Sequence, residues 1–256
     1  MKVLAVTCYT GGEELADMTS SMLKQLRDCV PKGVDAAISV CAQGVDAALT
    51  VDPNHFLDYD SNVGFAFGMN SAIDNGLRWE SEAPDFVLCL NNDLQFPQKD
   101  WLRNLLEIGV APVDQVIVPA TDSAAIRIQA GPRNKPSFPV DESSAYCWLV
   151  PFAWCQFLKD TYGFWLFDED FAPAYGEDNW TAFLLSKQFG ERVFRYVPRS
   201  FVKHLRARTS RTVKHDRAKS SRTLVAKLQA ELKDPKLRVD LRAWAHRYIA
   251  ILSKRS

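Results

Sequence analysis

Carboxylate and imidazole side chains stand at three points of this chain where an α/β protein could use them for chemistry. Asp93 closes the segment LNND (90–93), directly after the apolar run DFVLC (85–89). A carboxylate just beyond a buried strand lies at the mouth of an α/β sheet, where such sheets bind ligands. Hard oxygen ligands suit Mg²⁺ or Mn²⁺, so Asp93 could hold a divalent cation that bridges two phosphates. An ordinary Asn-Asn-Asp turn is the alternative.

The second point is the acidic pair Glu177 and Asp178 in AYGEDNWTAFLL (174–185), in the first turn of a predicted helix. One of the pair, Asp178, could act as a general base that takes a proton from an attacking hydroxyl. We expect the helix dipole to lower the pKa of Asp178 and keep it ionised. Glu177 points about 100° away around the helix, which suits it to orient an acceptor. Simple capping of the helix is the alternative.

The third point is His204, which ends RYVPRSFVKH (195–204), one predicted strand beyond the acidic pair. It could complete the metal site that begins with Asp93. A lone histidine after a strand is more often a packed or surface residue, and this reading stays open.

A glycine-containing segment, SNVGFAFGMNSAIDNG (61–76), offers a site for a ligand rather than a reactive group. Gly64 and Gly68 leave room for backbone to approach a ligand, and a helix beginning near Gly68 would point its free amides at it. Short glycine spacings are weak motifs, so a glycine turn into an ordinary helix is the alternative.

Alternating apolar and amphipathic runs predict the elements that position these residues. The expected strands are 3–8, 36–41, 47–51, 85–90, 115–119, 146–152 and 192–197, and the expected helices are 13–29, one opening near residue 68, 101–108 and 176–189. Residues 130–141 read as a loop. This order predicts an α/β domain with a mostly parallel sheet flanked by helices.

The C-terminal part of the chain differs in charge from the rest. Residues 199–256 hold 17 Lys and Arg against 4 Asp and Glu, although the whole chain has 31 of each kind. Two apolar series at helical spacing lie on either side of Pro235: Leu224, Leu228 and Leu232 before it, and Leu237, Leu241, Trp244 and Tyr248 after it. They predict two amphipathic helices in a basic tail, which suggests an anionic partner or a tail folded against its own acidic body.

Other features narrow the class of protein. The six cysteines are widely spaced in apolar runs without a Cys-x-x-Cys pair, so we expect buried free thiols. The N-terminus lacks a signal-peptide pattern, and no stretch reaches the eighteen apolar residues of a membrane span. A cytoplasmic protein is expected, with peripheral membrane association as an option for the tail.

Four segments in order, SNVGFAFGMN, LNND, GFWLFDEDFAPAYGEDNWTAFLLSKQFGERVFRYVP and VKH, resemble glycosyltransferase family 2, in particular its rhamnosyltransferase-like branch. The resemblance covers about residues 1–205. It implies a GT-A fold, a nucleoside diphosphate sugar donor, a divalent metal (Mn²⁺ or Mg²⁺) and inversion at the anomeric carbon. It divides the chain into a glycosyltransferase domain (1–205) and the basic amphipathic helical tail (206–256), for which we find no match.

The same resemblance assigns roles to individual residues. Asp93 and His204 match the metal ligands, and Asp178 matches the base, with Glu177 beside it. The positions that match the donor side are Tyr9, Asn62, Gly64, Phe65, Gly68 and Asn92. After the second strand the family often has an acidic residue with Asn or Gly and Ser, where this chain has CAQGVD. Gln43 or Asp46 could substitute there, so the nucleotide base stays open, and Ser61 replaces the acidic residue that commonly precedes Asn62.

The acceptor is not determined by these residues. A glycan or lipid-linked glycan is the default, with the basic tail on an anionic membrane surface. The tail could instead bind nucleic acid and make modified DNA bases the acceptor. A non-catalytic nucleotide-sugar-binding protein is a further alternative. A nucleotidyltransferase is disfavoured because TCYTGGEELAD, after the first strand, lacks the expected basic residues.

Overall fold

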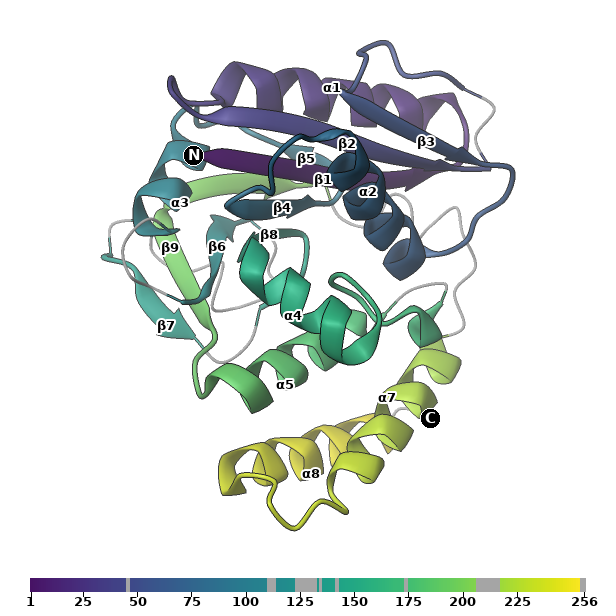
Figure 1. The fold of residues 1–256 in the computed structure, drawn as a ribbon, viewed down its shortest axis with the longest axis vertical. Coiled ribbons are helices and arrows are strands. Elements are labelled where there is room, and N and C mark those ends of the chain that lie inside the picture. The colour runs from purple at the N-terminus through teal and green to yellow at the C-terminus, as the bar shows by residue number, and fades with distance from the viewer. Residues whose placement is uncertain are drawn as a thin grey trace.

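The central feature of the computed structural model is one large sheet with helices on both faces and a helical pair at one end (Figure 1). The structure describes residues 1–44, 47–109, 114–122, 133, 135–140, 143–172, 175–205 and 217–253. Asp46 and residues 206–216 therefore lie outside the described part of the chain.

The first half of the sheet is parallel. Its strands run in the order β3-β2-β1-β4 and are β1 (Lys2–Thr10), β2 (Asp35–Gln43), β3 (His55–Tyr59) and β4 (Phe86–Leu90). Helices α1 (Glu13–Cys29) and α2 (Phe65–Trp79) connect them. In this arrangement β1 and β2 pair residue for residue, from Lys2 opposite Asp35 to Thr10 opposite Gln43. The carboxyl ends of these strands consequently open at one edge of the sheet.

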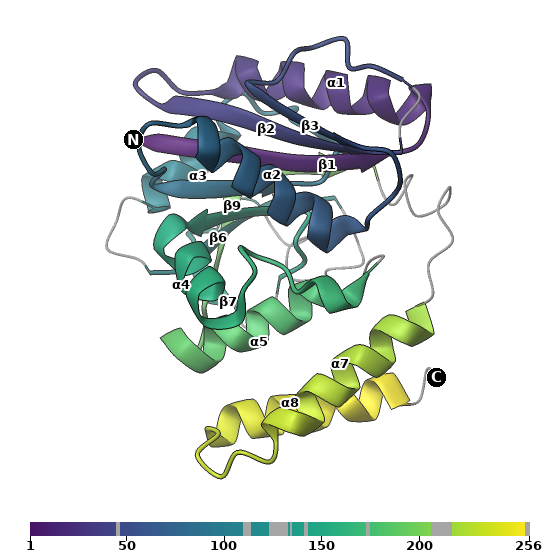
Figure 2. The same ribbon diagram turned by 45° about the vertical axis from the view of Figure 1, so that its right-hand side comes forward.

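Side-chain alternation along the strands divides the core into two layers. On β1, Leu4, Val6 and Cys8 face the layer that contains α2, whereas Val3 and Ala5 face the layer that contains α1. The helices α1 and α2 accordingly lie on opposite faces of the strands, as the second view shows (Figure 2). All six cysteines are buried free thiols, as the sequence predicted.

The second half of the sheet contains both parallel and antiparallel strand pairs. Its elements are β5 (Leu94–Gln95), α3 (Trp101–Gly109), β6 (Val116–Thr121), β7 (Phe138–Val140), β8 (Cys147–Pro151), α4 (Phe152–Tyr162), the 3₁₀ turn η1 (Glu169–Phe171), α5 (Glu177–Phe189) and β9 (Phe194–His204). Strand β8 is antiparallel to both β4 and β6, while β6 and β9 are parallel. Parallel pairing thus holds for the first four strands and for β6 with β9, and antiparallel pairs join the two blocks.

Strand β9 ends at His204, one of the residues that the sequence analysis singled out. It pairs with β6 on one side and with β7 and then β5 on the other. A register shift opposite Pro119 and Ala120 lengthens it beyond the predicted 192–197. Ser200 Oγ donates to the carbonyl of Trp101 at 2.8 Å, and the Phe201 N–H donates to Gln98 Oε1 at 2.9 Å, so the segment at α3 fixes this irregular stretch.

Most predicted elements are confirmed, and helix α1 has the predicted bounds. The strand expected at 47–51 is wrong: the third strand is β3, an edge strand whose residues alternate between half-buried and exposed, so its sequence is not apolar enough to stand out. Helix α2 begins at Phe65 rather than near Gly68. The strand predicted over 146–152 leads directly into α4, which the sequence did not predict.

The loop expected at 130–141 contains β7, a three-residue strand that pairs with β9. Its residues Phe138 and Pro139 are only partly covered, so the short segment shows no apolar run from which a strand could be predicted. Much of the remaining stretch lies outside the described residues.

The predicted amphipathic helices of the tail are α7 (Arg217–Glu231) and α8 (Val239–Ser253). Leu224 and Leu228 of α7, and Leu241 of α8, are buried in the hydrophobic cluster that also contains α5. Ion pairs join the tail to the body, including Lys187 Nζ to Glu231 Oε2 at 2.6 Å. The tail helices therefore pack on their own body. None of the helices in the described ranges combines the length and apolar character that crossing a membrane requires.

This packing predicts a stability effect from α7. Leu228 is 0% exposed, and its replacement by Ala should lower the free energy of unfolding by about 2–5 kcal/mol, because a cavity opens in a shared core. Ile251→Ala in α8 is the matched control, since Ile251 is 42% exposed, and should change stability by about 0.5 kcal/mol or less. Urea unfolding measures both. Equal small effects would contradict a tail that shares the core.

Candidate functional site

Asp93 and His204 meet at the edge of the sheet, although they are far apart in sequence. Asp93 lies between β4 and β5, and His204 ends β9. Leu94 is opposite His204 in the β5–β9 pair, and the Leu205 N–H donates to the Asp93 carbonyl at 3.0 Å. This backbone pairing places Asp93 Oδ1 3.0 Å from His204 Nε2, so the two predicted metal ligands are brought together.

The surroundings hold the imidazole in place. The ring stacks on Tyr146 with centroids 5.4 Å apart, and Asn91 Nδ2 lies 3.3 Å from Nε2. The His204 backbone N–H donates to Asp122 Oδ1 at 3.0 Å, so the end of β6 also contacts this residue. The imidazole is thereby presented toward Asp93 rather than toward bulk solvent.

The chemistry of this pair fits a divalent cation. Asp93 is 3% exposed, and within the described ranges its Oδ1 accepts no hydrogen bond of acceptable geometry, even though His204 Nε2 is near. A buried carboxylate oxygen left in this state is costly unless a cation or donor approaches it. The described residues include no group of three or more His, Cys, Asp or Glu side chains that could hold a metal. Phosphate oxygens and water are hard oxygen ligands that could complete the coordination.

The acidic pair lies at the start of α5. Tyr175 and Gly176, immediately before it, have φ of 82° and 93°, a tight left-handed turn that brings the chain into the helix. A non-glycine residue in this region is strained, a feature that clusters at functional sites. Glu177 is 7% exposed and Asp178 is half-buried, so the turn draws both residues of the pair out of bulk solvent.

Burial controls the protonation of both carboxyl groups. Burial, reinforced by the charge of Asp178, raises the pKa of Glu177 to about 8. Burial also raises the pKa of Asp178, and donors from Asn179, Ala145 and Ser144 oppose this shift. The expectation that the helix dipole would lower the pKa of Asp178 is therefore wrong, because desolvation is the larger effect. Burial thus favours the protonated form of Glu177, and the negative charge of Asp178 beside it acts in the same direction.

The acidic pair lies close to the carboxyl ends of the central strands. Burial raises the pKa of the Cys8 and Cys89 thiols, and the charge of Glu177 contributes to both shifts. Cys8 lies near the end of β1 and Cys89 near the end of β4, the strand that leads to Asp93. Glu177 is thus near the same edge of the sheet as the metal-ligand pair.

The glycine segment is organised by Gln43, at the end of β2. Its Oε1 accepts the N–H groups of Val63 and Gly64 at 3.0 Å each, and its Nε2 donates to the Gly64 carbonyl at 3.2 Å. A Cβ atom at Gly68 would come within 1.9 Å of Gln43 Nε2. The side chain of Gln43 therefore fills the space at Gly68, where the glycine pattern predicted an approaching ligand. Gly64 adopts φ 96°, a conformation that favours glycine.

The other predicted donor-side residues occupy the same region. Asn62 Oδ1 accepts the Gly64 N–H at 2.9 Å, and the Phe65 ring packs on Phe167 with centroids 5.3 Å apart. Tyr9 is buried, which raises the pKa of its hydroxyl to about 12. Asn92 Nδ2 donates to Thr19 Oγ1 at 3.2 Å, so α1 holds the residue before Asp93.

Asn70 is a structural residue of the site that was not predicted. Its Oδ1 accepts the N–H groups of Leu166 and Phe167, and its Nδ2 donates to Phe167 and to Glu169. It joins α2 to the loop that leads toward the acidic pair. The Gly-x-Asn motif of the resemblance includes Asn70, but the motif does not predict these hydrogen bonds. Ser144 and Asp122 were missed because single polar residues in turns carry no spacing signal.

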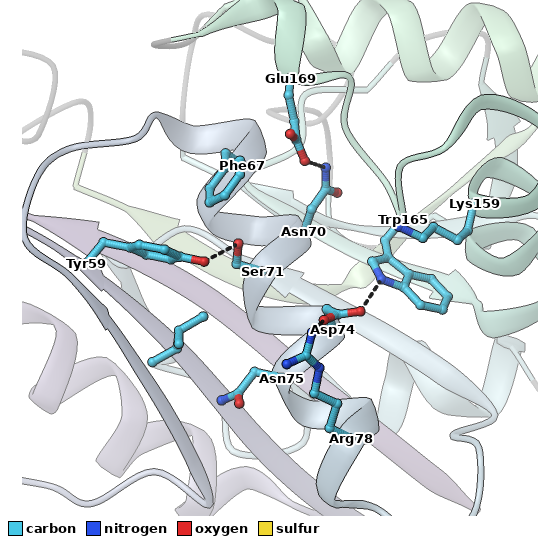
Figure 3. A pocket seen from close by; sticks show the side chains of 11 residues that line it. Tyr59, Phe67, Asn70, Ser71, Asp74, Asn75, Arg78, Lys159, Trp165 and Glu169 are labelled. Atoms are coloured by element: carbon cyan, nitrogen blue, oxygen red, sulfur yellow. Dashed lines mark hydrogen bonds and ion pairs between the residues drawn. The ribbon is translucent and has the colours of Figure 1, made fainter.

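A separate pocket of about 420 Å³ lies along the outer side of α2 (Figure 3). Its walls include Tyr59 of β3, Asn70 and Asp74 of α2, and Trp165 after α4, whose Nε1 donates to Asp74 Oδ1 at 3.4 Å. Asp93, His204, Glu177 and Asp178 do not line it.

Solved structures show which fold this architecture represents. A mannosyltransferase from Pyrobaculum calidifontis, solved with GDP-Man and Mn²⁺, matches over 99% of this chain and 74% of its own, with a TM-score of 0.61 and 14% identity. S. aureus TarS residues 1–349, solved with UDP-GlcNAc, matches over 100% of this chain and 72% of its own, with a TM-score of 0.64 and 12% identity. The chain has the GT-A fold.

The matches to known proteins are matches of structure. No protein-family model matches the chain, and no curated protein matches it. The chain spans 43% of a longer TarS structure, at a TM-score of 0.65 and 13% identity. The mixed sheet flanked by helices agrees with the GT-A fold class expected from the sequence.

The raised pKa of Glu177 predicts how stability depends on pH. Between its ordinary pKa of 4.5 and the folded value of about 8, the folded protein keeps a proton that the unfolded chain has released. The stability from this group is fully present below pH 4.5 and is lost as pH rises toward 8, by up to about 1.4 kcal/mol per pH unit. In Glu177→Gln this loss should be absent, so its unfolding free energy relative to wild type should increase from pH 5 to 8.

Urea titrations at several pH values measure this difference. Glu191→Gln, at an exposed position, serves as the control and should run parallel to wild type. A Glu177→Gln curve that also runs parallel to wild type would show that Glu177 titrates normally.

Proposed function

We propose that this protein is a metal-dependent glycosyltransferase that moves a sugar from a nucleoside diphosphate sugar to an acceptor hydroxyl. The observation that carries the proposal is the pairing of Asp93 and His204 at the edge of the sheet, with an acidic pair near the same edge. We further place it with glycosyltransferase family 2, on the order of the four sequence segments.

The similar structures support a donor of this kind. One neighbour was solved with GDP-Man and Mn²⁺, and TarS was solved with UDP-GlcNAc and with UDP. Asp93 and His204 would hold Mn²⁺ or Mg²⁺ in this chain. A cation bound there would neutralise charge on the leaving diphosphate.

The residues on the donor side would form the nucleotide site. Tyr9 lies near the end of β1, Asn92 follows β4, and Asn62, Gly64 and Phe65 form the loop that Gln43 holds at the end of β2. Gly68 would contribute by leaving room for Gln43. Gln43 contributes by holding the loop 62–65, since both ends of its amide are engaged with that backbone. Asp46, the other candidate, would contact the nucleotide base directly.

Asp178 would be the general base. It is half-buried, and Asn179 N–H and Nδ2 donate to its Oδ1 at 2.8 and 3.0 Å, which would orient the carboxylate to take a proton from an acceptor hydroxyl. Because burial raises the pKa of Glu177 to about 8, Glu177 would carry a proton at neutral pH. No second negative charge would then lie beside Asp178, and Glu177 could donate a hydrogen bond that orients the acceptor. Attack from the side of Asp178, opposite the leaving group, would invert the anomeric carbon.

The acceptor would be a glycan or a lipid-linked glycan. The tail supports attachment to an anionic surface, because exposed Lys233 and Lys236 lie at the turn between α7 and α8. Basic groups of this kind attract anionic headgroups, each by about 1 kcal/mol. Nucleic acid phosphates would be attracted by the same charges, so binding to vesicles and to DNA should be compared.

Metal-dependent donor binding is the first test. Asp93→Asn should weaken binding of UDP or GDP in the presence of Mn²⁺ by at least about tenfold, because one of two protein ligands loses its charge. Isothermal titration calorimetry with and without EDTA measures this. Asp160→Asn, an exposed aspartate of α4, is the control and should bind as wild type. Unchanged binding by Asp93→Asn would refute the metal assignment.

The base assignment predicts a split between binding and turnover. Asp178→Asn keeps the size of the side chain but cannot accept a proton, so turnover should fall about 10²–10⁴-fold while donor affinity stays near wild type. A panel of sugar nucleotides assayed for hydrolysis and transfer with Mn²⁺ gives both quantities. If Asp178→Asn retained more than about a tenth of the rate and Glu177→Gln lost nearly all of it, the two roles should be exchanged.

A further inference from the structure

The last helix of the tail reaches the residue that follows the proposed base. Tyr248, on α8, donates its hydroxyl hydrogen to Asn179 Oδ1 at 2.9 Å. Asn179 in turn donates its Nδ2–H and its backbone N–H to Asp178 Oδ1, at 3.0 and 2.8 Å. A continuous chain of hydrogen bonds therefore runs from the tail to the carboxylate.

Asp178 on one side and Tyr248 on the other hold the Asn179 amide in one orientation. The two ends of an asparagine amide are similar in shape, but one only donates and the other only accepts. The Asp178 carboxylate only accepts, so it requires the NH₂ group to face it, and Oδ1 then accepts the hydroxyl hydrogen of Tyr248. In the reversed orientation, Oδ1 would face the carboxylate oxygen, which is repulsive. Asn179 thus provides Asp178 with a side-chain donor in addition to the backbone N–H, and the Tyr248 hydroxyl of the tail holds the other end of that amide.

Packing fixes Tyr248 in this position. Its ring lies on Trp244 with centroids 4.1 Å apart, and Trp244 packs on Phe183 of α5 at 5.6 Å. The other tail helix is tied to the turn before α5, because Lys227 Nζ lies 2.9 Å from Asp168 Oδ2 and 2.7 Å from Asp170 Oδ2. Both tail helices therefore hold the segment that contains the acidic pair.

We propose that Tyr248 is a positioning residue for Asp178 and acts through Asn179, so that the tail completes the catalytic site. The description of Asp178 as the base rests on the proposed function; the hydrogen-bond chain does not. Donors to a carboxylate stabilise its charged form. Loss of the Tyr248 hydroxyl should therefore make the charged form of Asp178 less stable and its orientation less defined.

Titration of Asp178 by ¹³C NMR in the full-length protein tests this without any substrate. The Glu177→Gln background leaves only one carboxyl group of the pair to titrate. Asn179→Ala should raise the pKa of Asp178 by about one unit, and Tyr248→Phe, which keeps the ring stacked on Trp244, by about half a unit. Tyr59→Phe is the matched control, since the Tyr59 hydroxyl contacts Ser71 Oγ, and should change nothing.

The double variant decides whether Tyr248 acts through Asn179. If it does, Asn179→Ala/Tyr248→Phe should titrate as Asn179→Ala alone. The inference is overturned if Tyr248→Phe titrates like wild type, or if it adds the same shift when Asn179 is absent. A purely structural role for Tyr248 would move stability and leave this titration unchanged.

Turnover provides a second readout that separates the inference from the proposed function. Once a donor is found, Tyr248→Phe should lower kcat about tenfold with little change in donor KM, and should move the acidic limb of the pH profile upward. Wild type that turns over no sugar nucleotide would refute the proposed function while the titration stands. Active wild type with an unchanged Tyr248→Phe titration would refute the inference alone.

Discussion

The register between β5 and the end of β9 is the constraint on which the proposed site depends. Leu94 pairs with His204, and the Leu205 N–H bonds the Asp93 carbonyl. A shift of one residue would turn these side chains to opposite faces of the sheet. The irregular stretch of β9 at Ser200 is anchored to Trp101, so the contacts of α3 with β9 support the proposed site indirectly.

The sequence predicted the local features of the site better than its long-range contacts. Asp93 could be placed from the apolar run before it, and Glu177 and Asp178 from the helix after them, since those signals lie within a few residues. Gln43 was considered for the nucleotide base, whereas the structure gives it the hydrogen bonds that hold Val63 and Gly64. Tyr248 was predicted on the apolar face of a tail helix, but its contact with Asn179 and the role of Asn70 were not predicted, because their partners lie far along the chain.

The same distinction explains the errors in the fold and in the electrostatics. β3 is a half-covered edge strand, so its residues lack the apolar run that identified β4. The helix dipole at Asp178 could be predicted from the sequence, but the burial that outweighs it arises only in the folded structure. The basic tail, predicted as two amphipathic helices, places its apolar stripe in the same core as α5.

Paramagnetic broadening by Mn²⁺ is the most direct test of the central claim, that the β5–β9 register assembles a metal and nucleotide site. In the presence of UDP or GDP, substoichiometric Mn²⁺ should broaden the imidazole NMR signals of His204 and leave those of His55 and His246 sharp. His55 is bonded to Glu80 at 2.8 Å on the edge strand, and His246 is exposed on α8. A sharp His204 signal, or equal broadening of all three, would contradict the account.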